Sequence, residues 1–388
     1  MRSVSIIGAG LTKFSEHWDK NFKELIAEAG VKAIGDSGLE RKDIQAVYGG
    51  CMASGRFVGQ EHIGALIADQ LGLNPIPATR LEAACASGGV ALRAGYLAVA
   101  SGMYDVVAVG GIEKMTEVST EEAAIALGGA GDQETELFHG ASFPAIYALM
   151  ARAHMKEYGT TEEQLAMCAV KNHANAMHNE YAQYHREITV EDVMKSGPVS
   201  TPLKLLDCSP ITDGSAAVIL AANDVAKKVC ENPVEIVASA QASDTLALAS
   251  RASLSETRAT KKAAEDAYMM AGVKADDVDL AEVHDCFTIA EILAIEGLGF
   301  FKKGEGGKAT ERGDTKIGGR VAVNTSGGLK AKGHPVGATG VAQAVEAYMQ
   351  LRGTAGGRQV KDAKLALTHN VGGSGATSVV HLYRSLNR

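Results

Sequence analysis

Residues 82–89, Glu-Ala-Ala-Cys-Ala-Ser-Gly-Gly, decide the fold that the sequence predicts. Small residues and glycines open a predicted helix that runs to about residue 101. An apolar stretch at 106–109 follows as a predicted buried strand, and a Gly-Gly turn at 110–111 ends it. This unit is one helix and one strand of an alternating α/β architecture.

The second half of the chain repeats this plan. Asn-Thr-Ser-Gly-Gly at 324–328 precedes a predicted helix at about 340–351, and a predicted strand at 365–368 ends in Asn-Val-Gly-Gly at 370–373. The stretch 38–44 likewise resembles 272–278, and each leads into a predicted strand. Two similar halves are therefore expected.

Outward from this unit, predicted strands at 4–7 and 46–48 alternate with predicted helices at 21–37 and 61–71. This alternation favours βαβ units with a parallel or mixed sheet packed by helices. We expect an N-terminal half at 1–230 and a C-terminal half at 231–388. A polar stretch with helical patterns of its own, at about 116–202, is predicted to be an inserted loop domain that covers a site.

Composition excludes several classes of protein. The 388 residues, 46% hydrophobic and 22% charged, are typical of a globular protein of two or three compact units. The net charge of −8 disfavours nucleic acid or an anionic membrane as partner. Apolar runs stop short of the roughly 18 residues of a membrane span, and the N-terminus reads as a strand rather than a signal peptide. Six scattered cysteines without a C-x-x-C pair are expected to be free thiols in a reducing cytoplasm, with no metal site.

Three phosphate or hydrolase motifs are incomplete. Gly8-Ala-Gly10 begins like a dinucleotide fingerprint, but Lys13 stands at the third glycine position. No phosphate loop of the G-x-x-x-x-G-K-[ST] type is present. The glycine-rich stretch 372–376 departs from the nucleophile-elbow pattern at Ala376.

Cys85 is the sharpest chemical candidate. It lies just before a predicted helix, where unpaired N–H groups and the helix dipole favour a thiolate, and the glycines after it leave room for a ligand. The competing interpretation is a buried structural cysteine, which is the commoner role of a free cysteine.

Two further segments carry candidate reactive groups. His334 lies in a glycine-rich stretch and precedes a proline, so it is either a reactive imidazole or a turn histidine bonded to the backbone. His284 and Cys286 follow a predicted strand and would share one face if the strand continued. Their alternative is a surface histidine beside a core cysteine.

These motifs together resemble a thiolase over essentially the whole chain. The resemblance rests on the Cys85 helix start, Gly333-His334-Pro335, the His-Asp-Cys-Phe run at 284–287 and the Asn-Val-Gly-Gly-Ser-Gly run at 370–375. It is strongest to the branch with His-Asp-Cys-Phe, which includes the thiolase part of sterol carrier proteins and archaeal acetoacetyl-CoA thiolases. Many thiolases carry a second catalytic cysteine where this chain has Asn370, so the resemblance transfers that role to Cys286.

The resemblance implies an α/β thiolase fold and an acetyl-CoA C-acetyltransferase (acetoacetyl-CoA thiolase). Cys85 would form the acyl-enzyme with His334 as its base, and Cys286 would deprotonate the second acetyl-CoA. His334 and His284 would stabilise the enolate oxygen. An oxyanion hole would be made by Cys85, His334 and Gly372, with backbone N–H groups of Cys85 and Gly372 as donors. Coenzyme A is the acyl carrier, and no other cofactor is implied.

The resemblance also implies partners. We expect a homodimer or homotetramer, a role feeding the mevalonate pathway of isoprenoid biosynthesis, and association with hydroxymethylglutaryl-CoA synthase through a small zinc-ribbon/OB-fold protein. Three alternatives stay open: a degradative thiolase for longer chains, a decarboxylating ketoacyl synthase and a non-catalytic acyl-CoA-binding scaffold. Cys286 argues against the synthase, which makes its carbanion by losing CO2 and needs no thiol base.

Overall fold

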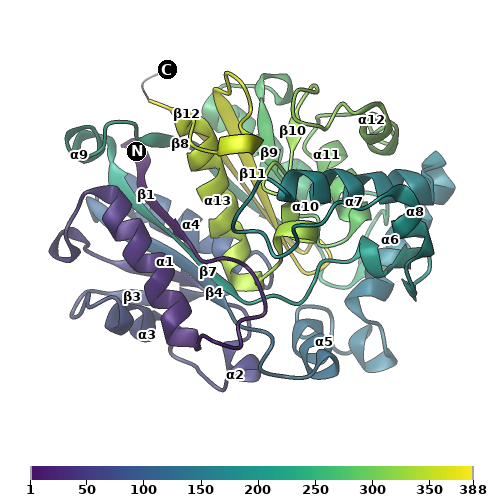
Figure 1. The fold of residues 1–388 in the computed structure, drawn as a ribbon, viewed down its shortest axis with the longest axis horizontal. Helices are drawn as coiled ribbons and strands as arrows, with labels where there is room; N and C mark the ends of the chain where they lie inside the picture. Colours follow the sequence, from purple (N-terminus) through teal and green to yellow (C-terminus); the bar gives the residue numbers. More distant parts are fainter. Residues whose placement is uncertain (1, 387–388) are drawn as a thin grey trace.

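A single mixed sheet of ten strands forms the centre of the molecule in the computed structural model, which describes residues 2–386 (Figure 1). The strand order is β10-β9-β11-β12-β8-β1-β7-β4-β2-β3. The strands of the first half are β1 (Val4–Leu11), β2 (Val47–Gly50), β3 (Ala78–Leu81), β4 (Val106–Glu113) and β7 (Gly214–Ala222). Those of the second half are β8 (Val234–Ser243), β9 (Leu280–Glu282), β10 (Ala322–Val323), β11 (Leu365–Gly372) and β12 (Thr377–Ser385).

The two halves have the same topology. In the first, β3, β2 and β4 are parallel, and β7 and then β1 are added antiparallel. In the second, β10, β9 and β11 are parallel, and β12 and then β8 are added antiparallel. Antiparallel pairing of β1 with β8, where Ser5 faces Glu235, joins the halves into one sheet. The expected α/β plan is present, whereas the exact limits of the halves and of the loop domain stay predictions.

Helices separate the molecule into layers. The inner helices α4 (Ser87–Ala100) and α13 (Val336–Arg352) pack on each other and on strands of both halves (Figure 1). Helices α1 (Phe22–Ser37) and α3 (Ile63–Gln70) cover the outer face of the first half, and α10 (Arg258–Ala271) covers that of the second. One apolar cluster fills the inner layer, and a separate cluster lies under each outer layer. The inner helices therefore start where the two halves meet.

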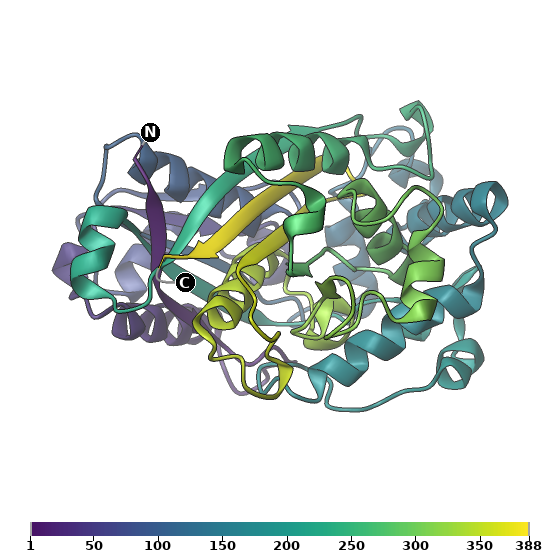
Figure 2. The same cartoon turned by 90° about the horizontal axis from the view of Figure 1, so that it is seen from above.

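The predicted insertion folds into helices beside the second half. It contains α5 (Thr120–Gly128), α6 (Phe143–Tyr158), α7 (Glu162–Ala176), α8 (Val190–Lys195) and the start of a hairpin of β5 (Pro198–Ser200) and β6 (Leu203–Lys204). Figure 2 shows α6, α7 and α8 at the end of the molecule opposite β1. Helix α11 (Thr288–Gly297) packs against α6 and α7. The remaining α-helices are α2 (Ser54–Phe57), α9 (Asn223–Val229) and α12 (Gly306–Arg312).

Local signals explain where α1 begins and ends. The Asn21 side chain accepts hydrogen bonds from the backbone N–H groups of Lys23 and Glu24, and the Glu24 carboxylate accepts the Asn21 N–H. This capping box satisfies N–H groups that a helix start leaves unpaired. Gly38, with φ of 70°, ends the helix in the left-handed conformation. The predicted helix at 21–37 therefore forms, with Asn21 as its cap.

Gly8 and Gly10, the glycines of the incomplete dinucleotide fingerprint, lie within a strand and allow helix α1 to pack closely against it; they do not form a phosphate-binding loop. Strand β1 runs through both of them to Leu11, beyond the predicted end at residue 7. A Cβ atom at Gly8 would lie 2.4 Å from the Ala33 carbonyl oxygen, and one at Gly10 would lie 2.1 Å from that of Ala29. Glycine is needed here because the backbone of α1 lies directly against the strand.

Other predicted boundaries differ by a few residues. The helix expected at 340–351 begins earlier, at Val336, because Pro335 is its N-cap and the glycines after it are accommodated within the helix. Within the predicted insertion, helix α7 ends at Ala176. Within residues 2–386, no helix combines the length and the apolar character needed to cross a bilayer.

Candidate active site

Cys85 lies in a tight turn between β3 and α4. Ala84, the residue before it, has a φ of 51°, a left-handed conformation that is unfavourable for an L-residue with a side chain. The Ser87 hydroxyl holds the turn, because it donates to the Ala84 carbonyl at 2.6 Å and accepts the Ala83 N–H at 3.0 Å. The sequence before α4 therefore presents the Cys85 side chain at the start of an inner helix.

The Cys85 thiol is protonated in the resting protein. Desolvation raises the pKa of Cys85 to about 12, and the backbone N–H of Gly373, which bonds to the thiol, only partly offsets this effect. The charge of Glu113 raises the pKa further. Helix α4 starts close to the predicted place, but its dipole, which favours a thiolate, has less effect on the pKa of Cys85 than desolvation has. A base must remove the thiol proton before the sulfur can attack.

Contacts with its neighbours fix the position of His334. Gly333, with φ of 111°, turns the chain before it, and the Thr212 hydroxyl accepts the His334 backbone N–H at 3.0 Å. The His334 Nδ1 atom lies 2.7 Å from the Thr339 hydroxyl oxygen, and that hydroxyl donates its own hydrogen to the Pro335 carbonyl at 3.1 Å. Nδ1 is therefore the protonated nitrogen. The Nε2 atom is buried, has no hydrogen-bond partner among residues 2–386, and carries a lone pair.

Burial keeps this imidazole neutral. It lowers the pKa of His334 to about 3, and the nearby charge of Lys332 lowers it further. A neutral imidazole with a free Nε2 lone pair is the form that accepts a proton at neutral pH.

His284 has the opposite tautomer. The Asn370 amide nitrogen donates to His284 Nδ1 at 3.2 Å and to the Cys85 carbonyl at 3.0 Å, while the amide oxygen accepts the Gly89 N–H at 3.1 Å. The amide is thus fixed in one orientation, and the neutral His284 ring carries its hydrogen on Nε2. That Nε2 is also buried, and no side chain or backbone group in the described part of the chain forms a hydrogen bond with it. Burial lowers the pKa of His284 well below its ordinary value.

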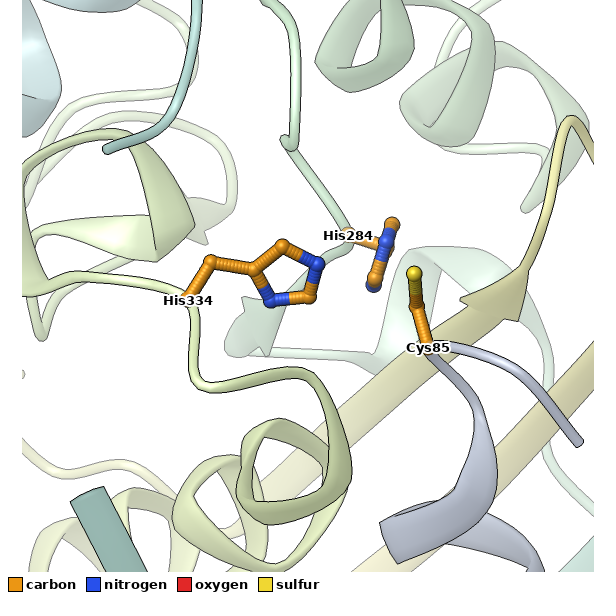
Figure 3. A group of neighbouring side chains, drawn as sticks. All are labelled: Cys85, His284 and His334. Carbon is orange, nitrogen blue, oxygen red and sulfur yellow. The ribbon is translucent and has the colours of Figure 1, made fainter. Parts of the chain in front are cut away.

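The three side chains converge (Figure 3). One ring nitrogen of His284, one of His334 and the Cys85 sulfur lie within 4.8 Å of one another. The two rings meet edge to face with centroids 5.0 Å apart. A thiol thus lies beside one acceptor nitrogen and one donor N–H. A metal ion would need a lone pair on each of the three atoms. Because the Asn370 amide donates to His284 Nδ1, the ring hydrogen of His284 is on Nε2, which then has no free lone pair. The cluster is therefore better suited to proton transfer.

Cys286 lies in the same region, but the contacts that position it differ from the expected ones. Strand β9 ends at Glu282, so alternation along a strand does not aim His284 and Cys286. Instead the Asp285 carboxylate accepts the N–H groups of Leu329 and Lys330, at 2.7 and 3.2 Å, and fixes the segment against the loop before His334. Burial raises the pKa of Cys286 well above its ordinary value, and the Cys85 thiol is near enough to raise it further.

Gly372 lies at the end of β11, against the turn that carries Cys85. A Cβ atom on Gly372 would lie 2.4 Å from the Ala83 carbonyl oxygen, so this backbone approach requires glycine. The N–H that bonds to the Cys85 thiol belongs to the next residue, Gly373. The role of Gly372 in an oxyanion hole stays a prediction.

Sequence reasoning missed the residues that orient the reactive groups. Asn370 was noted only because other thiolases have a cysteine at that position. No sequence pattern marked Thr339 or Asp285, because their hydrogen-bond partners meet them only in the folded chain. Tyr147, from α6, was also missed, and its hydroxyl donates to the Gly373 carbonyl at 3.0 Å. All six cysteines lie among the described residues and are free, as expected.

The chain matches known proteins along both of its halves. The family model described as "Thiolase, N-terminal domain" matches residues 4–224, and the model described as "Thiolase C-terminal domain-like" matches residues 240–385. The chain is 56% identical to the acetyl-CoA acetyltransferase of Methanothermobacter thermautotrophicus, over 99% of this chain and 100% of that protein. It is 51% identical to the acetyl-CoA acetyltransferase of Methanocaldococcus jannaschii, over 98% and 99% of the two chains.

A solved structure described as "Ltp2-ChsH2(DUF35) aldolase" superimposes with a TM-score of 0.86 at 26% identity, over 100% of this chain and 98% of that chain. These matches extend along both halves and confirm the expected fold. This chain belongs to the thiolase family.

Proposed function

We propose that this chain is an acetyl-CoA C-acetyltransferase that condenses two acetyl-CoA molecules to acetoacetyl-CoA and coenzyme A, reversibly, through an acyl-enzyme on Cys85. The observation that carries the proposal is the cluster of a thiol, an acceptor imidazole and a donor imidazole within 4.8 Å. The curated relatives named acetyl-CoA acetyltransferase support the choice of substrate. Coenzyme A is the acyl carrier of the reaction, which uses no further cofactor.

Acylation would begin with proton transfer from the Cys85 thiol to His334 Nε2. The sulfur attacks the thioester carbon of the first acetyl-CoA, a new C–S bond forms, and the C–S bond to coenzyme A breaks. The departing thiolate takes the proton of Cys286 and leaves as a thiol. His334 then carries the proton of Cys85, and Cys286 is a thiolate, so the charges balance.

The tetrahedral oxyanion of this step needs donors that are in place before the reaction. We assign the backbone N–H groups of Cys85 and Gly372 to that role, because the glycine allows the strand end to approach the Cys85 turn. Loss of one such donor costs about 3 kcal/mol of activation free energy.

Condensation would use the groups that acylation leaves charged. The Cys286 thiolate removes a proton from the methyl carbon of the second acetyl-CoA. The enolate oxygen accepts hydrogen bonds from His284 Nε2–H and from the protonated Nε2 of His334, which the two tautomers supply. The enolate carbon attacks the acyl carbon, Cys85 leaves and recovers its proton from His334, and acetoacetyl-CoA is released.

Condensation of two thioesters is uphill, so a consumer of acetoacetyl-CoA would draw the reaction forward. We therefore propose a role in feeding the mevalonate pathway, in the cytoplasm, with hydroxymethylglutaryl-CoA synthase bound through a small zinc-ribbon/OB-fold protein. The solved relative described with ChsH2(DUF35) supports a search for a second chain. Copurification without either partner would contradict this assembly, and light scattering would distinguish the proposed homodimer from a homotetramer.

The deciding experiment follows acetoacetyl-CoA with and without coenzyme A and identifies the acyl products. We expect CoA-dependent formation of acetyl-CoA, lost in Cys85→Ala and in Cys286→Ala. Cys230→Ala is the matched control, because this free cysteine ends α9 and takes no part in the cluster. Full activity of Cys85→Ala would reject the acyl-enzyme.

Product identity separates this proposal from its alternatives. Release of CO2 from a malonyl thioester would favour a decarboxylating synthase, and faster turnover of longer 3-ketoacyl-CoA would favour a degradative thiolase. Because the solved relative is described as an aldolase, retro-aldol cleavage of a 3-hydroxyacyl-CoA belongs in the same assay. Inactivity toward all of these substrates would favour a binding scaffold.

A further inference from the structure

Tyr147 is the residue of the inserted segment that reaches the candidate active site. It lies in α6, is only 3% exposed, and belongs to an apolar cluster that also contains Cys286 and Phe287. Its ring and that of Phe287 have centroids 4.7 Å apart. This packing fixes the direction of the tyrosine hydroxyl, because the ring has neighbours that leave it little rotamer freedom.

The hydroxyl lies between two groups of the site. It donates to the Gly373 carbonyl at 3.0 Å, and it lies near enough to the Cys286 thiol to lower the pKa of Cys286 against the larger effect of burial. The N–H of the same Gly373 bonds to the Cys85 thiol. Gly373 and Tyr147 are joined by a hydrogen bond, and each of them acts on one of the two cysteines.

A phenol has a single hydrogen, so Tyr147 can donate to only one of its two neighbours at a time. While Cys286 is a thiol, its S–H can donate to the tyrosine oxygen, and the tyrosine hydrogen points to Gly373. Once Cys286 has lost its proton, the sulfur has only acceptor capacity, and the tyrosine hydrogen is free to turn toward it. Burial raises the pKa of Tyr147 well above its ordinary value, so the hydroxyl keeps this hydrogen throughout.

We propose that Tyr147 is a further catalytic residue, whose hydroxyl stabilises the Cys286 thiolate by moving its hydrogen bond from the Gly373 carbonyl to that sulfur. No bond other than hydrogen bonds changes, and the proton of Cys286 goes where the proposed reaction sends it. This inference rests on the proposed function, since it assigns a partner to the base of that reaction.

The proposal gives the inserted segment a chemical role beyond covering the site. Cys286 comes from the second half, and its hydrogen-bond donor comes from α6, so the thiolate forms only where the two pack together. Arg251 supports the same corner, because its guanidinium donates to the Ser374 hydroxyl at 3.0 Å and lies near enough to Tyr147 for its charge to act there. A positive charge at this place also favours a thiolate.

The test measures the two thiols separately. Alkylation by iodoacetamide depends on the thiolate fraction, and peptide mass spectrometry assigns it to a residue. Cys286 is followed on a Cys85→Ala background and Cys85 on a Cys286→Ala background, each with and without Tyr147→Phe, over a range of pH. Loss of a hydrogen bond to a charged sulfur lowers the thiolate fraction, so Tyr147→Phe is expected to slow alkylation of Cys286 about tenfold. Alkylation of Cys85 should not change.

Tyr268→Phe is the matched control, because it removes another tyrosine hydroxyl that donates to a backbone carbonyl, that of Leu298, outside the site. Alkylation of Cys286 at the unchanged rate in Tyr147→Phe would overturn the proposal, and so would an equal slowing of both cysteines, which indicates a structural role. These rates need no turnover. If Cys286→Ala retained thiolase activity, the proposed function would fail, while the alkylation result would still report on the contact between Tyr147 and Cys286.

Discussion

The turn before α4 and the turn before α13 occupy corresponding places in the two halves, and each presents one reactive side chain. Cys85 lies two residues before the first residue of α4, and His334 lies two residues before that of α13. A residue in the left-handed region precedes each of them, Ala84 with φ of 51° and Gly333 with φ of 111°. The repeated topology thus brings two helix starts together, and one carries a thiol while the other carries an imidazole with an acceptor nitrogen.

The strand ends next to these turns differ between the halves. Gly50 of β2 pairs with Gly111 of β4. In the second half, the pairing of β9 with β11 joins Glu282 to Thr368, and two residues further on stand His284 and Asn370. A glycine pair in one half therefore corresponds to a hydrogen-bonded His–Asn pair in the other.

Packing explains the glycines. A Cβ atom at Gly50 would lie 2.7 Å from the Gly88 nitrogen of α4, and one at Gly111 would lie 2.3 Å from the Gly337 carbonyl oxygen of α13. The first half has no side chains at these strand ends, and this allows the two inner helices to approach. The second half has side chains there, and the hydrogen bond between them fixes the tautomer of His284. The same backbone plan therefore holds close packing in one half and the candidate site in the other.

The largest effect is expected from removing the His–Asn pair. Asn370→Ala leaves the Gly89 N–H and the Cys85 carbonyl without a partner and releases the tautomer of His284. We expect a fall in kcat of about 10²-fold, because a positioned proton donor contributes that much or more. Asn370→Asp keeps an acceptor for Gly89 but cannot donate to His284, so it separates packing from tautomer, which the 15N shifts of His284 report. Turnover within threefold of the unchanged enzyme would contradict the role of Asn370.

A smaller effect should follow from filling the glycine pair. In Gly111→Ala the added carbon meets the backbone of α13, which cannot rotate away, so we expect a loss of about 2 kcal/mol in the free energy of unfolding, measured in urea. Gly110→Ala is the control, since its Cβ atom would lie 3.7 Å from the Ala216 carbonyl, an ordinary contact. Equal losses in the two variants would show that close approach is not the reason for glycine.

Acid should destabilise the protein, because several histidines are buried in it, among them His284, His334, His369 and His381 of the second half. Burial lowers the pKa of His381 to about 3, below that of about 6.5 in an unfolded chain. Between these values only the unfolded chain binds the proton, so stability is present above pH 6.5 and is lost as the pH falls toward 3.

At one pH unit below 6.5 each such histidine costs about 1.4 kcal/mol. In His381→Gln the difference in unfolding free energy between neutral pH and about pH 5.5 should shrink by that amount. His139→Gln, at an exposed histidine, is the control and should leave the pH dependence unchanged. An unchanged pH dependence in His381→Gln would mean that this ring is not held neutral.

The smallest effects should come from the left-handed residues before Cys85 and His334, and they should have opposite signs. Ala84→Gly removes the steric cost of a side chain at φ of 51°, so the free energy of unfolding should rise by at most about 1 kcal/mol. Gly333→Ala adds that cost and brings a carbon to 2.8 Å from the Thr212 Cγ2 atom, so it should lower stability. Thermal unfolding checks both, and a shift of the same sign in the two variants would show that the turns are not alike.

Much of the fold was predictable because hydrophobic periodicity and glycine positions are local. The capped helix α1, the strand before Gly110 and the repeated second half follow from such signals. Helix α13 was predicted with a late start, because its first turn is rich in glycine, which local propensity disfavours and tertiary packing permits. Strand alternation was expected to direct the Cys286 side chain. Its position depends instead on hydrogen bonds that the backbone N–H groups of Leu329 and Lys330 donate to the Asp285 carboxylate.

The candidate reactive residues could be recognised from local sequence: Cys85 and His334 because glycines follow or flank them, and His284 and Cys286 because they stand in the His-Asp-Cys-Phe run. Their protonation states and hydrogen-bond partners depend on the folded chain. The tautomers come from Thr339 and Asn370, the protonated state of Cys85 comes from desolvation, and the partner of Cys286 comes from α6. These properties depend on atoms that are far apart in the chain and meet only when the two halves and the inserted segment pack, which no local pattern records.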